Sequence, residues 1–376
     1  MGNDEPLSSD IPHSPFRTPH SKADRFRAVV SGRERGVVAS VLRGALSIAS
    51  VGYGAAMRVR NWWYDTDRAR IEHVDALVVC VGNLTLGGTG KTPMVEWIVR
   101  WMRERGVRPA VVSRGYGAQA GAANDEAREL ADRLPGVPQV QNRDRAAAAR
   151  RAIDEFGAQV IVLDDGFQHR RLARELDVVM LDAAEPWGYE HVFPRGMLRE
   201  PPSGLTRAEV VVLSRADMVD DARRAEIRRR AERLSHGAVW AEVVHAPQRW
   251  LAAGAGAAAL DELCGQRVAA FCGIGNPRGF RHTLDRCGCE VAALREFPDH
   301  HAYTPSDLEQ LAAWAAASGA TAIVCTHKDL VKIGVDRLGA LPLWALVVGI
   351  EFLEGQVELE AKLAWLIARL PRCSEP

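Results

Sequence analysis

The sequence predicts an α/β fold, with a mostly parallel sheet that is covered by helices on both faces. From about residue 74 onward, short segments rich in Val, Ile and Leu alternate with segments that have helical periodicity. Strands that are apolar along their whole length are typical of parallel sheets buried between two layers of helices. The length of 376 residues is more than one ordinary hydrophobic core accommodates, so we expect two domains.

The strands are expected in two groups, separated by a passage rich in Gly and Ala at 251–260 that we interpret as a hinge or loop. The strand candidates before it are 76–83, 108–115, 158–166, 176–182 and 208–217, with helical patterns at 92–105 and 143–156. The strand candidates after it are 266–277, 288–297, 320–329 and 342–352. These patterns predict a larger domain over 65–245 and a smaller α/β/α domain over 246–376.

The first 35 residues are expected to form a disordered basic tail. Pro, Ser, Asp and His are frequent near its start, where no apolar period is found. Its last eleven residues carry Arg25, Arg27, Arg33 and Arg35. Such a segment does not contain enough apolar surface to fold by itself.

Residues 36–64 predict an amphipathic helix. Small and polar residues recur at spacings of three and four, which places them in one stripe: Ser40, Arg43, Ser47, Ser50 and Gly54. The sequence NWWY at 61–64 adds aromatic side chains of the kind found at membrane–water boundaries. The residues leave three alternatives open, namely a helix packed in the core, a helix lying in the membrane plane, and a membrane span.

The composition excludes some classes of protein. The formal net charge is zero, so the charge balance gives no support to a nucleic-acid partner. The seven cysteines include no CxxC pair, which indicates reduced thiols in a reducing compartment.

A glycine-rich turn, TLGGTGKT, follows the first expected strand and opens a helix. The backbone N–H groups of such a turn can point at one centre, where Lys91 reaches the β- and γ-phosphates and the Thr92 hydroxyl binds Mg²⁺. Thr85 stands where the general P-loop pattern has its first glycine, but the flanking strand and helix support a nucleotide site. The residues expected to hold the nucleotide are Thr85, Leu86, Gly87, Gly88, Thr89, Gly90, Lys91 and Thr92.

A second set of polar residues ends the strand at 158–166. Asp164 and Asp165 come at the end of this strand, where a P-loop protein needs a carboxylate to hold Mg²⁺. Gln168 and His169 follow in the same loop, so we expect them near the crevice at the carboxyl ends of the strands.

The choice between a kinase and a switch GTPase depends on which base is recognised. Guanine-binding P-loop proteins carry an NKxD motif, whereas this chain has SRAD at 214–217 and THKD at 326–329. Neither sequence fits, so ATP is the expected nucleotide. A kinase also needs a group that activates the acceptor hydroxyl, and Asp125 and His300 are candidates whose spacing alone does not bring them together.

The motifs together resemble one family, the tetraacyldisaccharide 4'-kinases, which are membrane-associated lipid A kinases of Gram-negative bacteria. The matching segments run in order over roughly residues 36 to 352, and about the first 30 residues lie outside the resemblance. They are VGNLTLGGTGKTP (81–93), SRGYG (113–117), NDEA (124–127), LDDGFQH (163–169), PRGMLREP (194–201), GIGNPRGF (273–280), FPDHHAY (297–303) and THKDLVK (326–332).

The resemblance implies transfer of the ATP γ-phosphate to the 4'-hydroxyl of a tetraacylated glucosamine disaccharide 1-phosphate. The resemblance implies that Asp125 accepts the proton of this hydroxyl and that His300 pairs with Asp125 and orients its carboxylate. Asn124 stands where the family usually has Gly, and His301 is a competing choice for the pair. Lys91 and Asp165 are the other residues expected to be catalytic.

The resemblance also implies two α/β/α domains that close over a cleft. The amino-terminal helix would seat the enzyme on the cytoplasmic face of the inner membrane as a peripheral or monotopic protein, with no obligate protein partner. The implied metal ligands are Thr92, Asp164, Asp165 and Glu200; candidates for phosphate, nucleotide or substrate contact are Arg114, Arg195, Arg199, Tyr116 and Gln168. Three other functions remain open: a membrane-associated P-loop GTPase, another small-molecule ATP kinase or ligase, and a nucleotide-binding scaffold.

Overall fold

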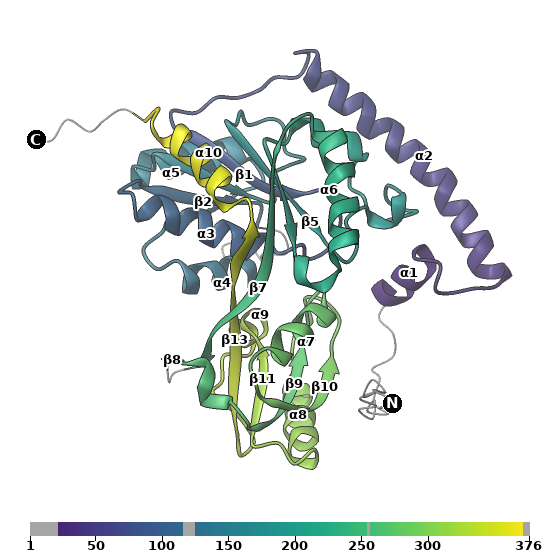
Figure 1. Cartoon of the computed structure of the whole chain (residues 1–376), viewed down its shortest axis with the longest axis vertical. Helices are drawn as coiled ribbons and strands as arrows, with labels where there is room; N and C mark the ends of the chain where they lie inside the picture. Colours follow the sequence, from purple (N-terminus) through teal and green to yellow (C-terminus); the bar gives the residue numbers. More distant parts are fainter. Residues whose placement is uncertain (1–21, 116–124, 254–255, 371–376) are drawn as a thin grey trace, which may run out of the picture.

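The computed structural model of the chain describes residues 22–115, 125–253 and 256–370. In this part of the chain thirteen strands form one mixed, mostly parallel sheet with helices on both faces, which confirms the predicted α/β class (Figure 1). The strand order is β10-β9-β11-β13-β7-β6-β5-β1-β4-β2-β3, with β8 beside β7 and β12 beside β13.

One half of the sheet forms the first lobe, in which all neighbouring strands are parallel. Its strands are β1 (Leu77–Asn83), β2 (Pro109–Ser113), β3 (Gln139–Gln141), β4 (Val160–Asp164), β5 (Leu176–Asp182) and β6 (Val210–Ser214). On β1, Val78 and Cys80 belong to the hydrophobic cluster on one face, whereas Val79 and Val81 belong to the cluster on the other. Both faces are therefore covered, which explains why β1 is apolar along most of its length.

The helices of the first lobe are α3 (Lys91–Arg103), α4 (Asp125–Arg133), α5 (Arg145–Phe156), α6 (Asp221–Ser235) and α10 (Gln356–Ile367). Helix α10 comes last in the sequence, yet Leu359, Leu363 and Leu366 are buried in a core of the first lobe. The ranges 65–245 and 246–376 expected for the two domains stay a prediction. Helix α10 falls in the second of these ranges but packs on the first lobe.

The other half of the sheet forms the second lobe, which has its own hydrophobic cluster on each face. Its strands are β8 (Gly256–Ala258), β9 (Arg267–Cys272), β10 (Glu290–Glu296), β11 (Ala322–Thr326) and β12 (Arg337–Leu338). Its helices are α7 (Pro277–Asp285), α8 (Pro305–Ala317) and α9 (His327–Ile333).

Two long antiparallel strands, β7 (Val239–Ala252) and β13 (Leu341–Glu354), run through both lobes and join them (Figure 1). The segment 251–260 is not the connection that we expected between the lobes. Strand β8 within it turns back and pairs with the end of β7, Trp250 opposite Ala258, so the strand pair makes the link.

The amino-terminal segment contains two helices, α1 (Lys22–Val30) and α2 (Val37–Asp65). Residues 1–21 of the expected disordered tail lie outside the described residues, but 22–30 are helical. Val29 and Val30 are buried, and Arg195 donates a hydrogen bond from Nη1 to the Val30 carbonyl at 2.9 Å. These contacts explain why the end of the tail is ordered.

Helix α2 has one side against the body of the protein and one side exposed. Ser50 and Gly54 are buried, and the Tyr53 hydroxyl donates to the Arg199 carbonyl at 2.8 Å. The exposed apolar side chains are Val37, Val38, Val41, Leu42, Ile48, Val51, Val59, Trp62 and Trp63. Within the described part of the chain, α2 is the one helix whose length and composition would allow it to cross a membrane.

Candidate active site

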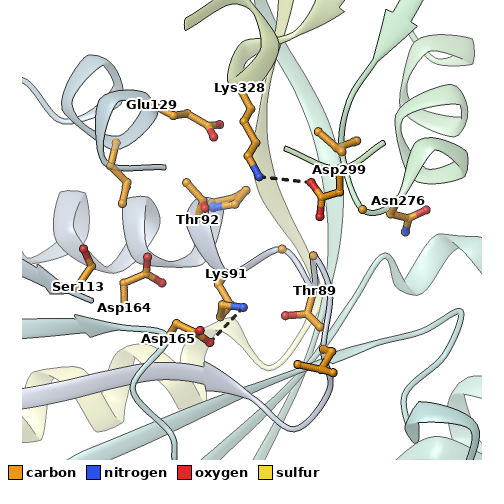
Figure 2. A pocket seen from close by; sticks show the side chains of 18 of the residues that line it. Thr89, Lys91, Thr92, Ser113, Glu129, Asp164, Asp165, Asn276, Asp299 and Lys328 are labelled. Carbon is orange, nitrogen blue, oxygen red and sulfur yellow. Dashed lines mark ion pairs between the residues drawn. The ribbon is translucent and has the colours of Figure 1, made fainter. Parts of the chain in front are cut away.

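A cavity of about 980 Å³ lies between the two lobes. The first lobe contributes the P-loop, the end of β4 and helix α4, and α2 contributes Tyr53, Met57 and Arg60. The second lobe contributes the loops that follow β9 and β10 and the start of α9. Figure 2 shows side chains from both lobes turned toward this space, with Lys91 on one wall and Lys328 on the other.

The P-loop lines the cavity from Leu86 to Thr92. Gly87 and Gly90 have φ of 114° and 82°, which side chains rarely allow, so the turn needs glycine at both positions. Thr85 does not line the cavity; it is buried and pairs with Leu198 in a short antiparallel bridge. Its φ is not positive, and this explains why a threonine replaces the first glycine of the general pattern.

Side chains from neighbouring strands hold the P-loop in shape. Asn83 donates from Nδ2 to the Thr89 hydroxyl at 3.0 Å, and the Ser214 hydroxyl donates to the Thr89 carbonyl at 2.8 Å. Arg215 donates to the Gly88 carbonyl at 2.5 Å and pairs with Asp182 at the same distance. Arg215 belongs to the SRAD sequence, so that sequence supports the phosphate loop.

Asp165 lies between two cations. Its Oδ1 is 3.3 Å from Lys91 Nζ, and Arg199 Nη1 donates to both carboxylate oxygens at 2.8 and 2.9 Å. Burial alone would raise the pKa of Asp165, but Lys91 and Arg199 outweigh it and lower the pKa to about 2. The carboxylate is thus ionised, and it fixes the lysine that faces the cavity.

The residues present fit a magnesium ion. Asp164 ends β4 opposite Val81 of β1, and Figure 2 shows its carboxylate on the same side of the cavity as Thr92. Hydroxyl and carboxylate oxygens are ligands that Mg²⁺ prefers, with phosphates and water completing its shell. The described residues contain no group of three His, Cys, Asp or Glu that could hold a metal by themselves.

Glu200, which we expected near the metal, does not line the cavity. It is fully buried, and Arg207 Nη2 donates to its two oxygens at 2.8 and 2.9 Å. Asn61 of α2 and Gln168 also donate to it, at 2.9 and 3.0 Å. Because these donors occupy the carboxylate, Glu200 joins α2 to the site, and its expected role as a metal ligand stays a prediction.

Gln168 does line the cavity, as expected. Its Nε2 donates to the Asn83 carbonyl at 2.9 Å. Arg60 of α2 donates to the backbone carbonyl of Gln168 at 2.6 Å. Helix α2 therefore forms part of the cavity edge, next to the loop that carries the aspartates.

His300 faces the cavity from the second lobe, and His301 does not. Nε2 of His300 is 3.3 Å from Lys328 Nζ. His301 points elsewhere, with its Nε2 3.2 Å from Asp307 and its ring centroid 4.7 Å from that of Phe297. Between the two histidines that the sequence left open, the structure places His300 at the site.

Asp125 is the first residue of α4, and its side chain lies outside the described part of the structure, as do Tyr116 and Asn124. Helix α4 itself borders the cavity through Glu129, Leu130 and Arg133. The pairing of Asp125 with His300 therefore stays a prediction, although both segments reach the same cavity.

Of the three arginines considered for phosphate contact, Arg114 and Arg199 line the cavity, whereas Arg195 holds α1. Other cationic residues of the lining were not predicted from the sequence: Arg133, Arg143, Arg145, Arg215 and Lys328. His245 of β7, whose ring lies against Gly90, was not predicted either. None of these residues belongs to a phosphate-binding motif. Only Arg215 and Lys328 lie in sequences that had drawn attention, SRAD and THKD, and we had considered those sequences for base recognition.

A family model described as tetraacyldisaccharide-1-P 4'-kinase matches residues 42–368. The chain belongs to this kinase family. The tetraacyldisaccharide 4'-kinase of Anaeromyxobacter dehalogenans (strain 2CP-C) is 43% identical over 352 residues, covering 88% of this chain and 93% of the relative. That of Syntrophus aciditrophicus (strain SB) is 37% identical, covering 79% and 86%. The crystal structure of LpxK from Aquifex aeolicus in complex with ATP is 26% identical with a TM-score of 0.69, covering 86% of this chain and 99% of that one.

Proposed function

We propose that this kinase transfers the γ-phosphate of Mg-ATP to the 4'-hydroxyl of a tetraacylated glucosamine disaccharide 1-phosphate, forming lipid IVA. The observation that carries the proposal is the composition of one cavity. The P-loop forms one wall, His300 and the helix that begins at Asp125 border the same space, and α2 lies at its edge. Family membership and a solved relative with bound ATP support the same assignment.

In the proposed reaction Asp125 accepts the proton of the 4'-hydroxyl while the 4'-oxygen bonds to the γ-phosphorus. The bond between this phosphorus and the β–γ bridging oxygen breaks, and ADP leaves. Lys91 and the N–H groups of the P-loop stabilise the charge on the phosphate oxygens. Thr92 and Asp164 would hold the magnesium ion, which neutralises phosphate charge when it is bound.

We infer that α2 lies in the membrane plane on the cytoplasmic side of the inner membrane. Its contacts with the body through Tyr53, Arg60 and Asn61 mean that lipid cannot surround this half of the helix. Its exposed valines and the half-exposed Trp62 and Trp63 fit the interfacial region of a bilayer. The cavity would then open beside the surface that holds the acyl chains of the substrate.

The contacts of SRAD and THKD favour ATP over GTP. Asp217 is 2.7 Å from His282 Nε2. Asp329 is fully buried and accepts hydrogen bonds from the Gly273 amide and the Tyr303 hydroxyl, both at 3.0 Å. Neither carboxylate lines the cavity, so neither of these two motifs supplies a guanine-recognition residue there.

Nucleotide turnover with and without the lipid acceptor tests the proposal. We expect transfer from ATP to the detergent-dispersed disaccharide lipid, slow turnover without the lipid, and little transfer from GTP. Hydrolysis of GTP that does not require the lipid would favour a GTPase instead. ATP binding without transfer would favour a scaffold, and transfer to a soluble acceptor alone would favour another small-molecule kinase.

A further inference from the structure

The start of α9 places four consecutive residues, Thr326 to Asp329, at the seam between the lobes. Three of them, Thr326, His327 and Lys328, line the cavity. The reaction proposed above assigns no role to this segment. One of its residues nevertheless contacts His300, the residue that we expect to orient the catalytic aspartate.

Lys328 is the residue of this segment that contacts His300. Its Nζ is 3.3 Å from His300 Nε2 and 3.6 Å from Asp299 Oδ1. The side chain is 14% exposed, so its four-carbon chain is held by the protein. Figure 2 shows Lys328 and Asp299 facing each other as an ion pair, and the P-loop lies on the opposite side of the cavity.

The base of α9 is itself fixed, and this fixes the position of Lys328. The buried Asp329 carboxylate accepts hydrogen bonds from the Thr326 hydroxyl at 2.6 Å and from the Gly273 amide at 3.0 Å. The Tyr303 hydroxyl donates to it as well, at 3.0 Å. One carboxylate therefore ties the start of α9 to the loop after β9 and to the segment after His300.

His300 has an unusual backbone conformation. Its φ is 59°, in the left-handed region that residues other than glycine seldom adopt. Such strain persists where surrounding contacts hold the residue, and it is frequent at functional sites. The contact with Lys328 is one that holds the ring.

We propose that Lys328 is a positioning residue that fixes the tautomer of His300. Nε2 of His300 is 3.3 Å from the Lys328 ammonium and farther, 3.9 Å, from the Asp299 carboxylate. Because an ammonium group has only hydrogen-bond donors, Nε2 accepts through its lone pair in the shorter contact. A neutral imidazole that accepts at Nε2 carries its proton on Nδ1. The second nitrogen of the ring is thereby made a donor.

The consequence for the reaction rests on the function proposed above. A donor at Nδ1 can bond one oxygen of the Asp125 carboxylate, which leaves the other oxygen to accept the proton of the 4'-hydroxyl. The inverse tautomer would present a lone pair to the carboxylate and repel it. Lys328 would thus act on catalysis through His300, without contact to the acceptor.

The test compares full-length wild type with Lys328→Met, Lys328→Arg and a matched control, Lys362→Met, in which an exposed lysine of α10 is replaced. Selective ¹⁵N labelling of histidine reports the protonated nitrogen of each ring, and a His300→Gln variant assigns the His300 signals. We expect wild type to show a protonated Nδ1 and an unprotonated Nε2. In Lys328→Met these signals should move toward the other tautomer.

The kinetic arm measures lipid phosphorylation in detergent. Lys328→Met should lower kcat about 10- to 100-fold, a part of the usual contribution of general-base catalysis, with KM for ATP unchanged. Lys328→Arg, which retains donors, should recover the wild-type tautomer and part of the rate, and Lys362→Met should match wild type.

Two results would overturn the proposal. Unchanged His300 signals with a raised KM for ATP would make Lys328 a nucleotide ligand, and an unchanged rate and spectrum would remove its role altogether. If wild type transfers no phosphate to the lipid, the proposed function fails, whereas the tautomer assignment is still decided by the spectrum.

Discussion

Asp165 is the residue through which the P-loop and the loop after β4 are joined. Lys91 and Arg199 both contact its carboxylate, and its φ of 53° turns the chain sharply after the strand. The two cations hold the pKa of Asp165 at about 2. At neutral pH the group therefore keeps Lys91 in place as a fixed positive charge for the phosphates.

Lys91→Ala should remove nearly all transfer, because the P-loop lysine supplies the positive charge that stabilises the β- and γ-phosphates. We expect a loss of about 10³-fold or more in kcat/KM, measured with ³²P-labelled ATP and the lipid acceptor. Lys362→Ala, on the exposed side of α10, is the control. A Lys91→Ala enzyme with near-normal turnover would contradict the assignment of the nucleotide site.

Asp125→Ala should lower kcat by about 10²- to 10⁴-fold, the usual contribution of a general base. ATP affinity should remain close to that of wild type, because the proposed role of this carboxylate is toward the acceptor. Equilibrium binding of ATP alongside the transfer assay separates the two effects. If the variant instead loses ATP binding, Asp125 belongs to the nucleotide or metal site.

His245 predicts a dependence of stability on pH. Burial, together with Arg215 and Arg133, lowers the pKa of His245 from 6.5 to about 3. Below pH 6.5 the unfolded chain binds a proton at this histidine that the folded protein does not. The free energy of unfolding must therefore fall as the pH falls from 6.5 toward 3.

Thermal melts over this pH range test the prediction. His245→Gln should flatten the fall of Tm with pH, and the same change at the exposed His73 controls for loss of an imidazole. Burial also lowers the pKa values of His169 and His327 to about 4 each, so part of the slope should remain. An unchanged slope in His245→Gln would show that this ring is not buried in its neutral form.

At the scale of elements, the two sides of α2 have different surroundings: one contacts the protein and the other is exposed. One side contacts Arg199, Glu200 and Gln168 at the edge of the cavity. The other side exposes Val41 and Val51, which are 68% and 70% accessible. An exposed apolar side of this kind suits the in-plane membrane position proposed for α2.

Val41→Asp combined with Val51→Asp should weaken binding to lipid vesicles by about 10-fold or more, since each buried valine side chain is worth roughly 1.5 kcal/mol. Vesicle flotation measures the effect. Activity on detergent-dispersed substrate should change little. Val357→Asp on α10, where the valine is 76% exposed, is the matched control, and equal losses in both proteins would contradict a specific role of α2.

The sequence predicted the strands of the first lobe well, because β1, β4, β5 and β6 are mostly apolar and end in polar residues. It did not predict that 22–30 form a helix, since this order depends on a contact with Arg195, distant in sequence. It also did not predict the hydrogen bonds from Arg207 and Asn61 to Glu200, because these residues meet only in the folded chain.

At the scale of the whole molecule, β7 and β13 connect two lobes through one sheet, and the cavity lies where the lobes meet. Contacts across this seam were not predictable from local patterns. Arg133 of α4, for example, donates to the Val348 carbonyl of β13 at 2.8 Å, and the two residues are far apart in the chain. The P-loop and the aspartates after β4 were predictable because each is a short contiguous motif.

Transfer of ³²P from γ-labelled ATP to the tetraacylated disaccharide 1-phosphate tests the central claim most directly. The comparison acceptor is the same lipid with a phosphate already on its 4'-oxygen. We predict stoichiometric labelling of the first lipid at the 4'-position, none of the second, and labelling of the first lipid slowed about 10³-fold or more with Lys91→Ala. Absence of label from the first lipid, or equal labelling of the blocked one, would contradict the claim that this chain is a lipid 4'-kinase.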